Sequence, residues 1–206
     1  MTPHLVVFAK VPQPGVAKTR LIPALGAQGA ADLALRMLQH TLQQALAANA
    51  GPVELCTSPG PGDVAWVGVE LPDALLWTDQ GEGDLGQRMD RAVERVTAQG
   101  QPVLLMGTDC PALSAPCIAE AAQALATHDS VLVPVADGGY VLVGLHAPCP
   151  DIFADMAWST PGVAAVTLQR LAALGRRVWV GPTLHDIDEP ADLVHLPAHL
   201  RQDQRF

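Results

Sequence analysis

The stretch SVLVPVADGGYVLVGL, residues 130–145, decides the kind of sheet that this chain forms. Two nearly continuous apolar runs flank the triplet Asp137-Gly138-Gly139. Glycine adopts the positive φ angles that tight hairpin turns require, so this pattern predicts a β-hairpin. Apolar residues at almost every position indicate strands that are covered on both faces. We therefore expect an antiparallel strand pair within a buried sheet.

Outward from this hairpin, apolar runs of strand length alternate with helical stretches. Strands are expected at 5–9, 53–58, 74–79, 102–109, 130–136, 140–145 and 177–181. Helices are expected at about 27–49, 84–98, 114–126 and 161–174. Alternating strands and helices predict parallel βαβ units with right-handed crossovers. The expected fold class is therefore α/β, with three α/β/α layers, a mostly parallel sheet and one hairpin. With no repeat or linker, one domain is expected over residues 1–206.

Several residues with strong terminal preferences support the helix boundaries. Asp84 stands where an N-cap belongs, just before the helix expected at 84–98. Thr160 and Pro161 match an N-cap followed by the first helical position. Gly175 falls just after the last periodic residue of the same segment, where helices commonly end.

The composition excludes several classes of function. The formal net charge of the 206 residues is −9 and the arginines are scattered, which argues against a nucleic-acid surface. No run approaches the roughly 18 apolar residues that a membrane helix needs. No signal peptide is evident, so we expect a cytoplasmic protein by default. The four cysteines form no Cys-x-x-Cys pair, and we expect buried thiols.

The loop after the first expected strand holds an unusual share of the positive charge. Lys10 and Lys18 are the only lysines of the chain, and Arg20 follows closely. The segment is not a P-loop, because Ala17 stands where that motif has glycine. Ligands of α/β sheets bind beyond the carboxyl ends of the strands, which is where this loop is expected. We therefore expect Lys10, Lys18 and Arg20 to bind phosphate, although a solvated loop without function fits the position equally well.

Acidic residues follow two further segments at the same expected edge. Asp109 ends the strand expected at 102–109, with Thr108 as a weaker neighbour. Asp186 and Asp188 are two apart, so in an extended chain they point the same way, and His185 precedes them. Mg²⁺ and Mn²⁺ prefer such carboxylates together with substrate phosphates. The competing interpretation is that these aspartates only cap a turn and a helix.

A glycine-bearing loop completes the expected site. Gly83 lies just before the helix expected at 84–98, where the backbone can approach a ligand closely. Asp137, beside the hairpin glycines, is a candidate base on the acceptor side. The chain presents no Ser-His-Asp or Cys-His set. The combination indicates metal-assisted transfer from a nucleotide diphosphate or triphosphate.

Six ordered blocks carry a resemblance to a known family. They are FAKVPQPGVAKTRL, GDLGQRM, GTDCPAL, DGGYVLVGL, WSTPGVAAVTL and DIDEPADL. Together, from about residue 4 to 194, they resemble the bacterial GT-A-type glycosyltransferase-like family associated with radical-SAM/selenodomain and arsenosugar gene clusters. The resemblance implies a Rossmann-like nucleotide-diphospho-sugar transferase fold. The first and last blocks also resemble segments of phospholactate guanylyltransferases and of molybdenum-cofactor nucleotidyltransferases.

Transferred onto this sequence, the resemblance places Lys10, Lys18 and Arg20 at the nucleotide phosphates and Asp109 at the metal. GTDC has one aspartate where many glycosyltransferases have Asp-x-Asp, so a further metal ligand must come from elsewhere. Asp188 or Asp186 is the expected choice, with Asp137 as an alternative. The Leu-x-Gly-Gly loop of nucleotidyltransferases is also missing.

The expected function is a Mg²⁺- or Mn²⁺-dependent transferase that moves a sugar from a nucleotide sugar to a small-molecule acceptor. Nucleotidyl transfer from a nucleoside triphosphate, with release of pyrophosphate, is the alternative. A nucleotide-binding protein without catalysis is the alternative from another class, because a single GTDC aspartate is also compatible with a degenerate site.

Overall fold

The computed structural model describes residues 1–72 and 75–201. Ala74, the first residue of the strand expected at 74–79, lies outside the described residues. The strands are β1 (His4–Lys10), β2 (Val53–Ser58), β3 (Leu76–Asp79), β4 (Val103–Met106), β5 (Ser130–Pro134), β6 (Tyr140–Leu145) and β7 (Val178–Val180). Within the described ranges they form one seven-stranded sheet in the order β3-β2-β1-β4-β6-β5-β7.

The hairpin predicted at 130–145 is confirmed. β5 and β6 pair antiparallel, and the turn is closed by Val135 and Gly139, whose N–H and carbonyl groups lie 3.0 Å apart. Gly138 has a φ of 91°, which only glycine adopts without strain. β6 also pairs antiparallel with β4, whereas the pairs β1–β2, β1–β4, β2–β3 and β5–β7 are parallel. The sheet is therefore mostly parallel, with one reversed strand.

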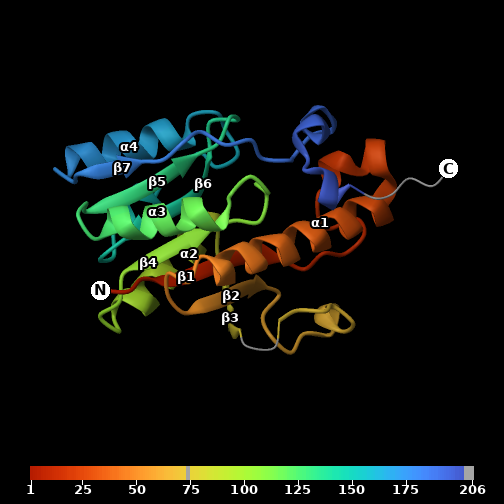
Figure 1. Ribbon diagram of the computed structural model, residues 1–206, viewed down its shortest axis with the longest axis horizontal. Coiled ribbons are helices and arrows are strands. Elements are labelled where there is room, and N and C mark those ends of the chain that lie inside the picture. Colours follow the sequence, from red (N-terminus) through yellow and green to blue (C-terminus); the bar gives the residue numbers. More distant parts are fainter. Residues whose placement is uncertain (73–74, 202–206) are drawn as a thin grey trace.

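Helices cover both faces of the sheet, giving the predicted three layers (Figure 1). They are α1 (Ile22–Ala47), α2 (Leu85–Thr97), α3 (Ala115–Leu125) and α4 (Val163–Ala173). α1 and α3 pack on one face, where Leu5 and Val7 of β1 point. α2 and α4 pack on the other, where Val6 points. Successive side chains of β1 thus point alternately into two hydrophobic cores, one on each face of the sheet.

Two helix starts differ from the sequence-based expectation. α1 begins at Ile22 and bends at Gly26, whose φ and ψ are 71° and 166°, so the segment expected from residue 27 is its straight part. Thr160 and Pro161 do not open α4. Its N-cap is Gly162, and the Thr160 hydroxyl donates to the Ala157 carbonyl at 2.7 Å. The predicted start was wrong because this segment is held by the hairpin.

Contacts between Gly138 and the segment before α4 show how it is held. A Cβ atom on Gly138 would lie 2.0 Å from the Pro161 carbonyl oxygen, so the two backbones are in direct contact. The Ala164 N–H donates to the Gly138 carbonyl at 2.8 Å. The chain at 160–164 is therefore fixed to the hairpin turn, which places both at one edge of the sheet.

The segment after β7 returns over the first half of α1 and brings the last acidic block to the same edge. Two 3₁₀ helices, η4 (Pro190–His195) and η5 (Ala198–Leu200), lie in this segment. Ile187 and Leu200 are buried against Met37 and neighbouring side chains of α1. Figure 1 shows this return of the chain to the N-terminal end of α1. Among the described residues no helix is long and apolar enough to cross a membrane.

Candidate functional site

A pocket of about 730 Å³ lies where the carboxyl ends of the parallel strands meet the hairpin. Its volume is typical of a site for a small ligand. It is lined by the loop after β1, the loop after β3, the loop after β4, the hairpin, the segment 158–160 and the returning segment at 186–188. All of the residues expected at a site line it: Lys10, Lys18, Arg20, Gly83, Asp109, Asp137, Asp186 and Asp188.

Lys18 forms the centre of an ionic cluster in this pocket. Its Nζ lies 2.5 Å from Asp109 Oδ1, 2.6 Å from the Ile187 carbonyl oxygen and 3.3 Å from Asp188 Oδ1. The side chain is only 6% exposed. Burial opposes its charge, but Asp109 and Asp188 outweigh burial and raise the pKa of Lys18. Its charged form is therefore stabilised by the protein.

This environment differs from the one expected for Lys18. An ammonium group has three N–H donors, and three protein oxygens already surround this one. Lys18 thus joins the loop after β1 to the loop after β4 and to the returning segment, and its three donors are used within the protein although the residue lines the pocket. The backbone at Lys18 is left-handed, with φ 49° and ψ 43°, a conformation that is uncommon for residues other than glycine.

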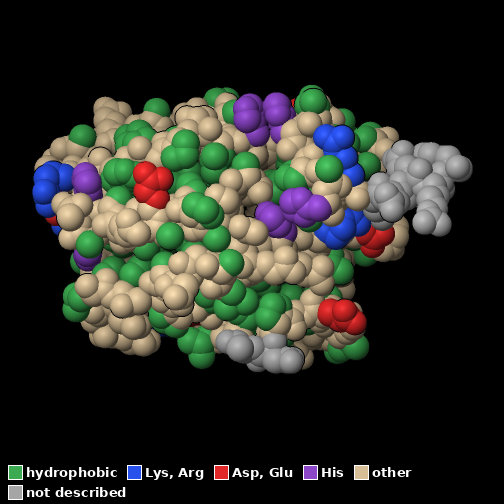
Figure 2. Space-filling view, viewed as in Figure 1, with side chains coloured by type: hydrophobic (Ala, Val, Ile, Leu, Met, Phe, Trp, Pro, Cys, Tyr) green, Lys and Arg blue, Asp and Glu red, His purple; other side chains and the backbone are tan. Residues whose placement is uncertain are grey.

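The other basic residues of the loop are more accessible. Arg20 is 57% exposed, and its Nη1 donates to Asp188 Oδ2 at 3.0 Å. Lys10, the last residue of β1, is exposed and lines the pocket. Figure 2 shows basic side chains gathered near the returning segment and the start of α1. Lys10 can therefore reach an anion in the pocket, and Arg20 can do so by exchanging its ion pair with Asp188 for the anion.

Two acidic residues of the pocket lie close to one another. Burial, and next the nearby charge of Asp137, raise the pKa of Asp186 to about 6, with smaller effects from Asp188 and Asp192. The Asp137 carboxylate accepts the Gly139 N–H at 2.7 Å, which fixes its direction. The fold therefore concentrates negative charge at this side of the pocket, and a cation bound there would relieve the repulsion.

This arrangement suits the expected metal in its chemistry but does not provide a complete set of ligands. Among the described residues, no group of three or more His, Cys, Asp or Glu side chains could hold a metal ion. Asp109 and Asp188 are separated by the Lys18 ammonium. Mg²⁺ and Mn²⁺ need only one or two carboxylates when phosphates and water complete the shell. Asp186 and the carboxylates near it fit that requirement.

The start of α2 forms the wall around Gly83. The Asp84 carboxylate accepts the Gln87 N–H at 2.9 Å, and the Gln87 side chain accepts the Asp84 N–H at 3.0 Å, which confirms the predicted N-cap. Gly83 has a φ of 109°, so no other residue fits there without strain. The capped start of α2 thereby fixes Gly83 in the pocket lining.

Sequence reasoning missed Arg88, which also lines the pocket. Its Nε donates to the Gly83 carbonyl at 2.8 Å, and its Nη1 lies 3.3 Å from Ser58 Oγ. The sequence did contain a signal for Arg88. The helix dipole disfavours a basic residue near the start of a helix, so an arginine at this position indicates a role other than stabilising the helix. Arg88 adds a cation at the end of β2, where Ser58 is the register partner of Lys10.

Sequence reasoning also missed the segment 158–160, although it belongs to one of the quoted blocks. Trp158, Ser159 and Thr160 line the pocket beside the hairpin. Ser159 has a φ of 61°, and such strained residues cluster at functional sites. Thr108 lines the pocket as well. His185 is not among the lining residues and stacks on His195, with ring centroids 4.0 Å apart.

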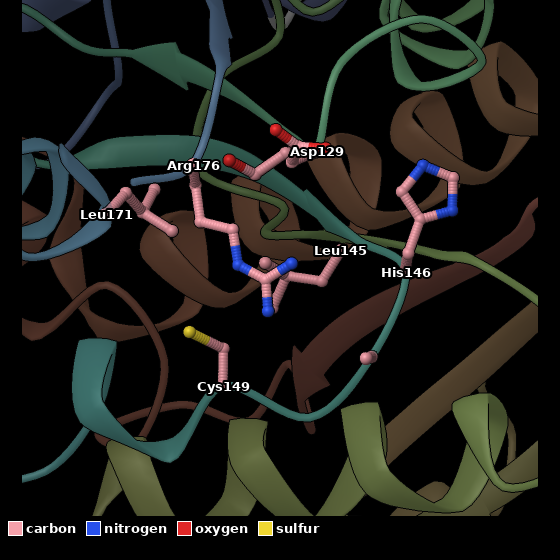
Figure 3. Close-up of a pocket in the computed structure, with 8 residues that line it drawn as sticks. Asp129, Leu145, His146, Cys149, Leu171 and Arg176 are labelled. Carbon is pink, nitrogen blue, oxygen red and sulfur yellow. The ribbon is translucent and has the colours of Figure 1, made fainter. Parts of the chain in front are cut away.

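A second cavity, shown in Figure 3, is lined by Asp129, Cys149 and Arg176 among others. Its volume is about 10 Å³, which admits at most one water molecule.

The four cysteines all fall within the described ranges and are buried free thiols, as predicted. The chemistry of the molecule therefore points to the large pocket.

A sequence family described as "Uncharacterized protein conserved in bacteria (DUF2064)" matches residues 41–160. The comparison with curated proteins finds no match. Among solved structures, the chain is similar to a "putative nucleotide-diphospho-sugar transferase" from Desulfovibrio desulfuricans G20. The identity is 29%, the TM-score is 0.87, and the match covers 98% of this chain and 89% of the other.

More distant structures share the fold. The manganese complex of Rv0371c from Mycobacterium tuberculosis H37Rv has 15% identity and a TM-score of 0.58, covering 95% of this chain and 97% of the other. A CMP:2-keto-3-deoxy-manno-octonic acid synthetase complexed with CTP has 11% identity and a TM-score of 0.57, covering 95% and 96%. The predicted fold, of the nucleotide-diphospho-sugar transferase type, is confirmed.

Proposed function

This chain belongs to the DUF2064 family and resembles nucleotide-diphospho-sugar transferases, and we propose that it transfers a sugar from a nucleotide-diphospho-sugar to a small acceptor. The family and the fold support a nucleotide-utilising transferase in general. The choice of glycosyl transfer is our inference from the pocket and from the 29% identical relative.

The observation that carries the proposal is that one pocket presents both accessible basic side chains and carboxylates. Lys10, Arg20 and Arg88 present cations, and Asp137 and Asp186 present carboxylates at the hairpin side. A diphosphate bridging a nucleoside and a sugar has its negative charge in the middle and hydroxyl groups at the sugar end. Basic side chains suit the first, and carboxylates suit the second as acceptors of hydroxyl protons.

We assign the phosphates to Lys10, Arg20 and Arg88. Arg20 and Arg88 can each offer a planar pair of donors to phosphate oxygens, and Lys10 offers a compact charge. Gly83, whose carbonyl accepts from Arg88, also lines the pocket and lets the backbone approach the phosphates closely. Lys18 acts as a positioning residue in this proposal, because it holds Asp109 and Asp188 on either side of its ammonium group.

The divalent cation, Mg²⁺ or Mn²⁺, would be held by carboxylates among Asp109, Asp186 and Asp188 together with the phosphates. When bound, it would neutralise the negative charge that develops on the departing nucleoside diphosphate. The protein's own contribution is to gather these carboxylates on one edge of the sheet. The buried side chain of Ile187, which lies between Asp186 and Asp188 in the sequence, anchors this segment to the core.

Asp137 is the proposed base. In the reaction, an acceptor oxygen forms a bond to the anomeric carbon while the bond from that carbon to the phosphate oxygen breaks. The acceptor hydroxyl proton passes to the Asp137 carboxylate, and the nucleoside diphosphate leaves with the bonding electrons. The Gly139 N–H holds this carboxylate in place, and Trp158 to Thr160 form the adjacent wall for the acceptor.

A thermal-shift panel with Mn²⁺ tests the binding part of this proposal. We expect nucleoside diphosphates or nucleotide sugars to raise the melting temperature, and the shift to shrink in Arg88→Ala and Asp109→Ala. Glu70→Gln, an exposed residue outside the pocket, serves as the control. Absence of a shift with every nucleotide would contradict the proposal.

Product analysis then separates the possible reactions. Release of nucleoside diphosphate from a nucleotide sugar supports glycosyl transfer. Release of pyrophosphate from a nucleoside triphosphate would instead establish nucleotidyl transfer. Binding without turnover of either class would leave a nucleotide-binding protein without catalysis.

A further inference from the structure

Two histidines lie together at the surface, outside the pocket, where the returning segment packs on α1. His40 belongs to α1 and His199 to η5, and their ring centroids are 5.0 Å apart. His199 Nε2 lies 3.3 Å from His40 Nδ1. Figure 2 shows neighbouring histidine side chains at the surface over α1 and the returning segment. Neither His40 nor His199 lines the pocket, so the pair has no part in the reaction proposed above.

The carbonyl group of Pro111 fixes which nitrogen of His40 carries the proton. His40 Nε2 lies 3.1 Å from the Pro111 carbonyl oxygen. A carbonyl oxygen only accepts hydrogen bonds, so Nε2 is the protonated nitrogen and Nδ1 is the unprotonated one. Burial lowers the pKa of His40 in spite of this hydrogen bond, so the ring is uncharged at neutral pH. His40 thus turns toward His199 a nitrogen in the form that binds metal ions.

The surroundings of His40 are those of metal-binding histidines in general. Such a histidine usually donates its other ring N–H to a backbone carbonyl or a carboxylate, which fixes the tautomer and the direction of the ring. The Pro111 carbonyl has this place beside His40. His199 is exposed, so its Nδ1 can carry the proton and donate to water when Nε2 binds an ion.

The separation of the two nitrogens fits a single tetrahedral ion. Two imidazole nitrogens bound to Zn²⁺ at about 2.0–2.1 Å, with a tetrahedral angle between them, lie about 3.3–3.4 Å apart. His199 Nε2 and His40 Nδ1 are 3.3 Å apart, and the two ring planes are inclined by 44°. An ion can therefore replace the hydrogen bond between the rings when the exposed His199 ring turns its lone pair toward it.

A second pair of histidines, His185 and His195, lacks this geometry. Their rings are stacked, with centroids 4.0 Å apart and planes 13° from parallel. The lone pairs of imidazole nitrogens lie in the plane of the ring, so those of parallel rings run side by side and do not meet at one ion. The stacked pair therefore provides a matched control of two exposed histidines in the returning segment.

Contacts between η5 and α1 hold the first pair in place. Arg36 donates from Nε to the Leu200 carbonyl at 3.0 Å, and Leu200 is buried in the same cluster as Met37. Arg36, Met37 and His40 share one face of α1, because positions three and four apart are neighbours on a helix. Since η5 is already docked, little order has to be gained when an ion binds between His40 and His199.

We propose that His40 and His199 bind a transition-metal ion of the Zn²⁺, Ni²⁺ or Cu²⁺ class, with water in the remaining positions, and that this ion links η5 to α1. Imidazole suits these ions, whereas Mg²⁺ prefers oxygen ligands. Within the described ranges no third His, Cys, Asp or Glu side chain joins the pair, so we expect reversible binding. The site is separate from the carboxylates of the pocket and does not depend on the proposed function.

Calorimetric titration of the metal-free protein with Zn²⁺ in excess Mg²⁺ tests the proposal, because Mg²⁺ competes for carboxylates and leaves histidines free. We expect the Zn²⁺ affinity to fall about tenfold or more in His199→Gln and in His40→Gln. The double variant His185→Gln/His195→Gln should keep the wild-type affinity. Zn²⁺ should also raise the melting temperature of the wild type, and this rise should be lost in His199→Gln.

Electron paramagnetic resonance of bound Cu²⁺ identifies the ligands directly. The wild type should show nitrogen couplings from two imidazoles, and His199→Gln should show couplings from one. If His40→Gln does not fold, His199→Gln still decides, because its side chain is exposed. An unchanged Zn²⁺ affinity in His199→Gln, or no Zn²⁺ binding in excess Mg²⁺, would overturn the proposal. Neither result concerns nucleotide binding, so the proposed function is tested separately.

Discussion

The ammonium group of Lys18 and the carboxylate of Asp109, ninety-one positions apart in the chain, lie 2.5 Å from each other at the edge of the sheet. Lys18 comes from the loop after β1, and Asp109 comes from the loop after β4, the strand that pairs with β1. Asp188, from the far end of the chain, completes the cluster at 3.3 Å. One buried cation thus connects three segments that the proposed reaction needs together.

Removing this cation should loosen the pocket. In Lys18→Met, Asp109 and Asp188 lose their partner, and we expect the free energy of unfolding to fall by about 1–3 kcal/mol. This loss is smaller than the loss expected on breaking a fully buried ion pair, because the side chains of Asp109 and Asp188 are 58% and 39% exposed. Urea unfolding at neutral pH measures the change.

Lys10→Met is the matched control for charge. It removes the same charge at the end of β1, eight residues before Lys18, but Lys10 is exposed, so we expect a change within about 0.5 kcal/mol. Nucleotide affinity should nevertheless weaken in this variant. Equal stability losses in the two variants would show that Lys18 has no special positioning role.

Glu54 gives the stability a defined pH dependence. The residue is 1% exposed, Arg95 pairs with it, and His4 Nε2 lies 3.1 Å from its Oε2. Burial alone would raise its pKa, but hydrogen bonds from His4, Arg95 and Thr78 outweigh burial and lower the pKa to about 2. Its stabilising effect is fully present above the unfolded pKa, near 4.3, and is lost as the pH falls toward 2.

We therefore expect Glu54→Gln to lose about 2–3 kcal/mol at pH 7. The difference between the wild type and this variant should shrink as the pH is lowered from about 4.3 toward 2. Urea unfolding curves at several pH values measure it, and Glu70→Gln on the surface should change little at any pH. A difference that stays constant down to pH 2 would contradict the assigned pKa.

The contact between Gly138 and Pro161 should link the hairpin to the acceptor side of the pocket. Gly138→Ala places a Cβ atom 2.0 Å from the Pro161 carbonyl at a φ of 91°, so the segment before α4 must move. Gly62→Ala is the control, because Gly62 has a φ of 86° but no atom within 4 Å of its Cβ position.

Backbone strain alone should cost the control about 1–2 kcal/mol, and we expect Gly138→Ala to lose clearly more. Acceptor KM should rise in Gly138→Ala, with nucleotide affinity little changed. The thermal stability of both variants and their kinetic constants provide the comparison. If the two variants behave alike, the hairpin does not position the acceptor wall.

Asp137→Asn tests the proposed base. The amide keeps the shape and can still accept the Gly139 N–H, but it cannot take the acceptor proton. We expect kcat to fall by about 10²–10⁴-fold, with nucleotide affinity nearly unchanged. Steady-state kinetics together with nucleotide titration measure both. A variant with wild-type kcat would exclude Asp137 as the base.

Much of the fold could be predicted because strand and helix periods are local properties. The hairpin at 130–145 is fully specified by two apolar runs and a glycine turn, and the observed strands lie within it. Asp84 is likewise a local signal, since its capping partner Gln87 is three residues away. The start of α4 was wrong because Pro161 is held by Gly138, a long-range contact that local preferences do not contain.

The site was predictable only in part, for a similar reason. The expectation that ligands bind just beyond the strand ends led to Lys18, Asp109 and Asp188, and all of them line the pocket. The same expectation could not show that protein oxygens would accept hydrogen bonds from the Lys18 ammonium group. That pairing depends on how three distant segments meet. Arg88 was missed because it lies within a helix, whereas only residues in the loops beyond strand ends were considered.

The most direct test of the central claim is to detect nucleoside diphosphate after incubating the protein with Mg²⁺ or Mn²⁺, a panel of nucleotide sugars and a mixture of small hydroxyl-bearing acceptors. The account predicts that the wild type releases nucleoside diphosphate from at least one nucleotide sugar, and that Asp109→Ala and Asp137→Asn release far less. Release of pyrophosphate from nucleoside triphosphates, with every nucleotide sugar left intact, would contradict it.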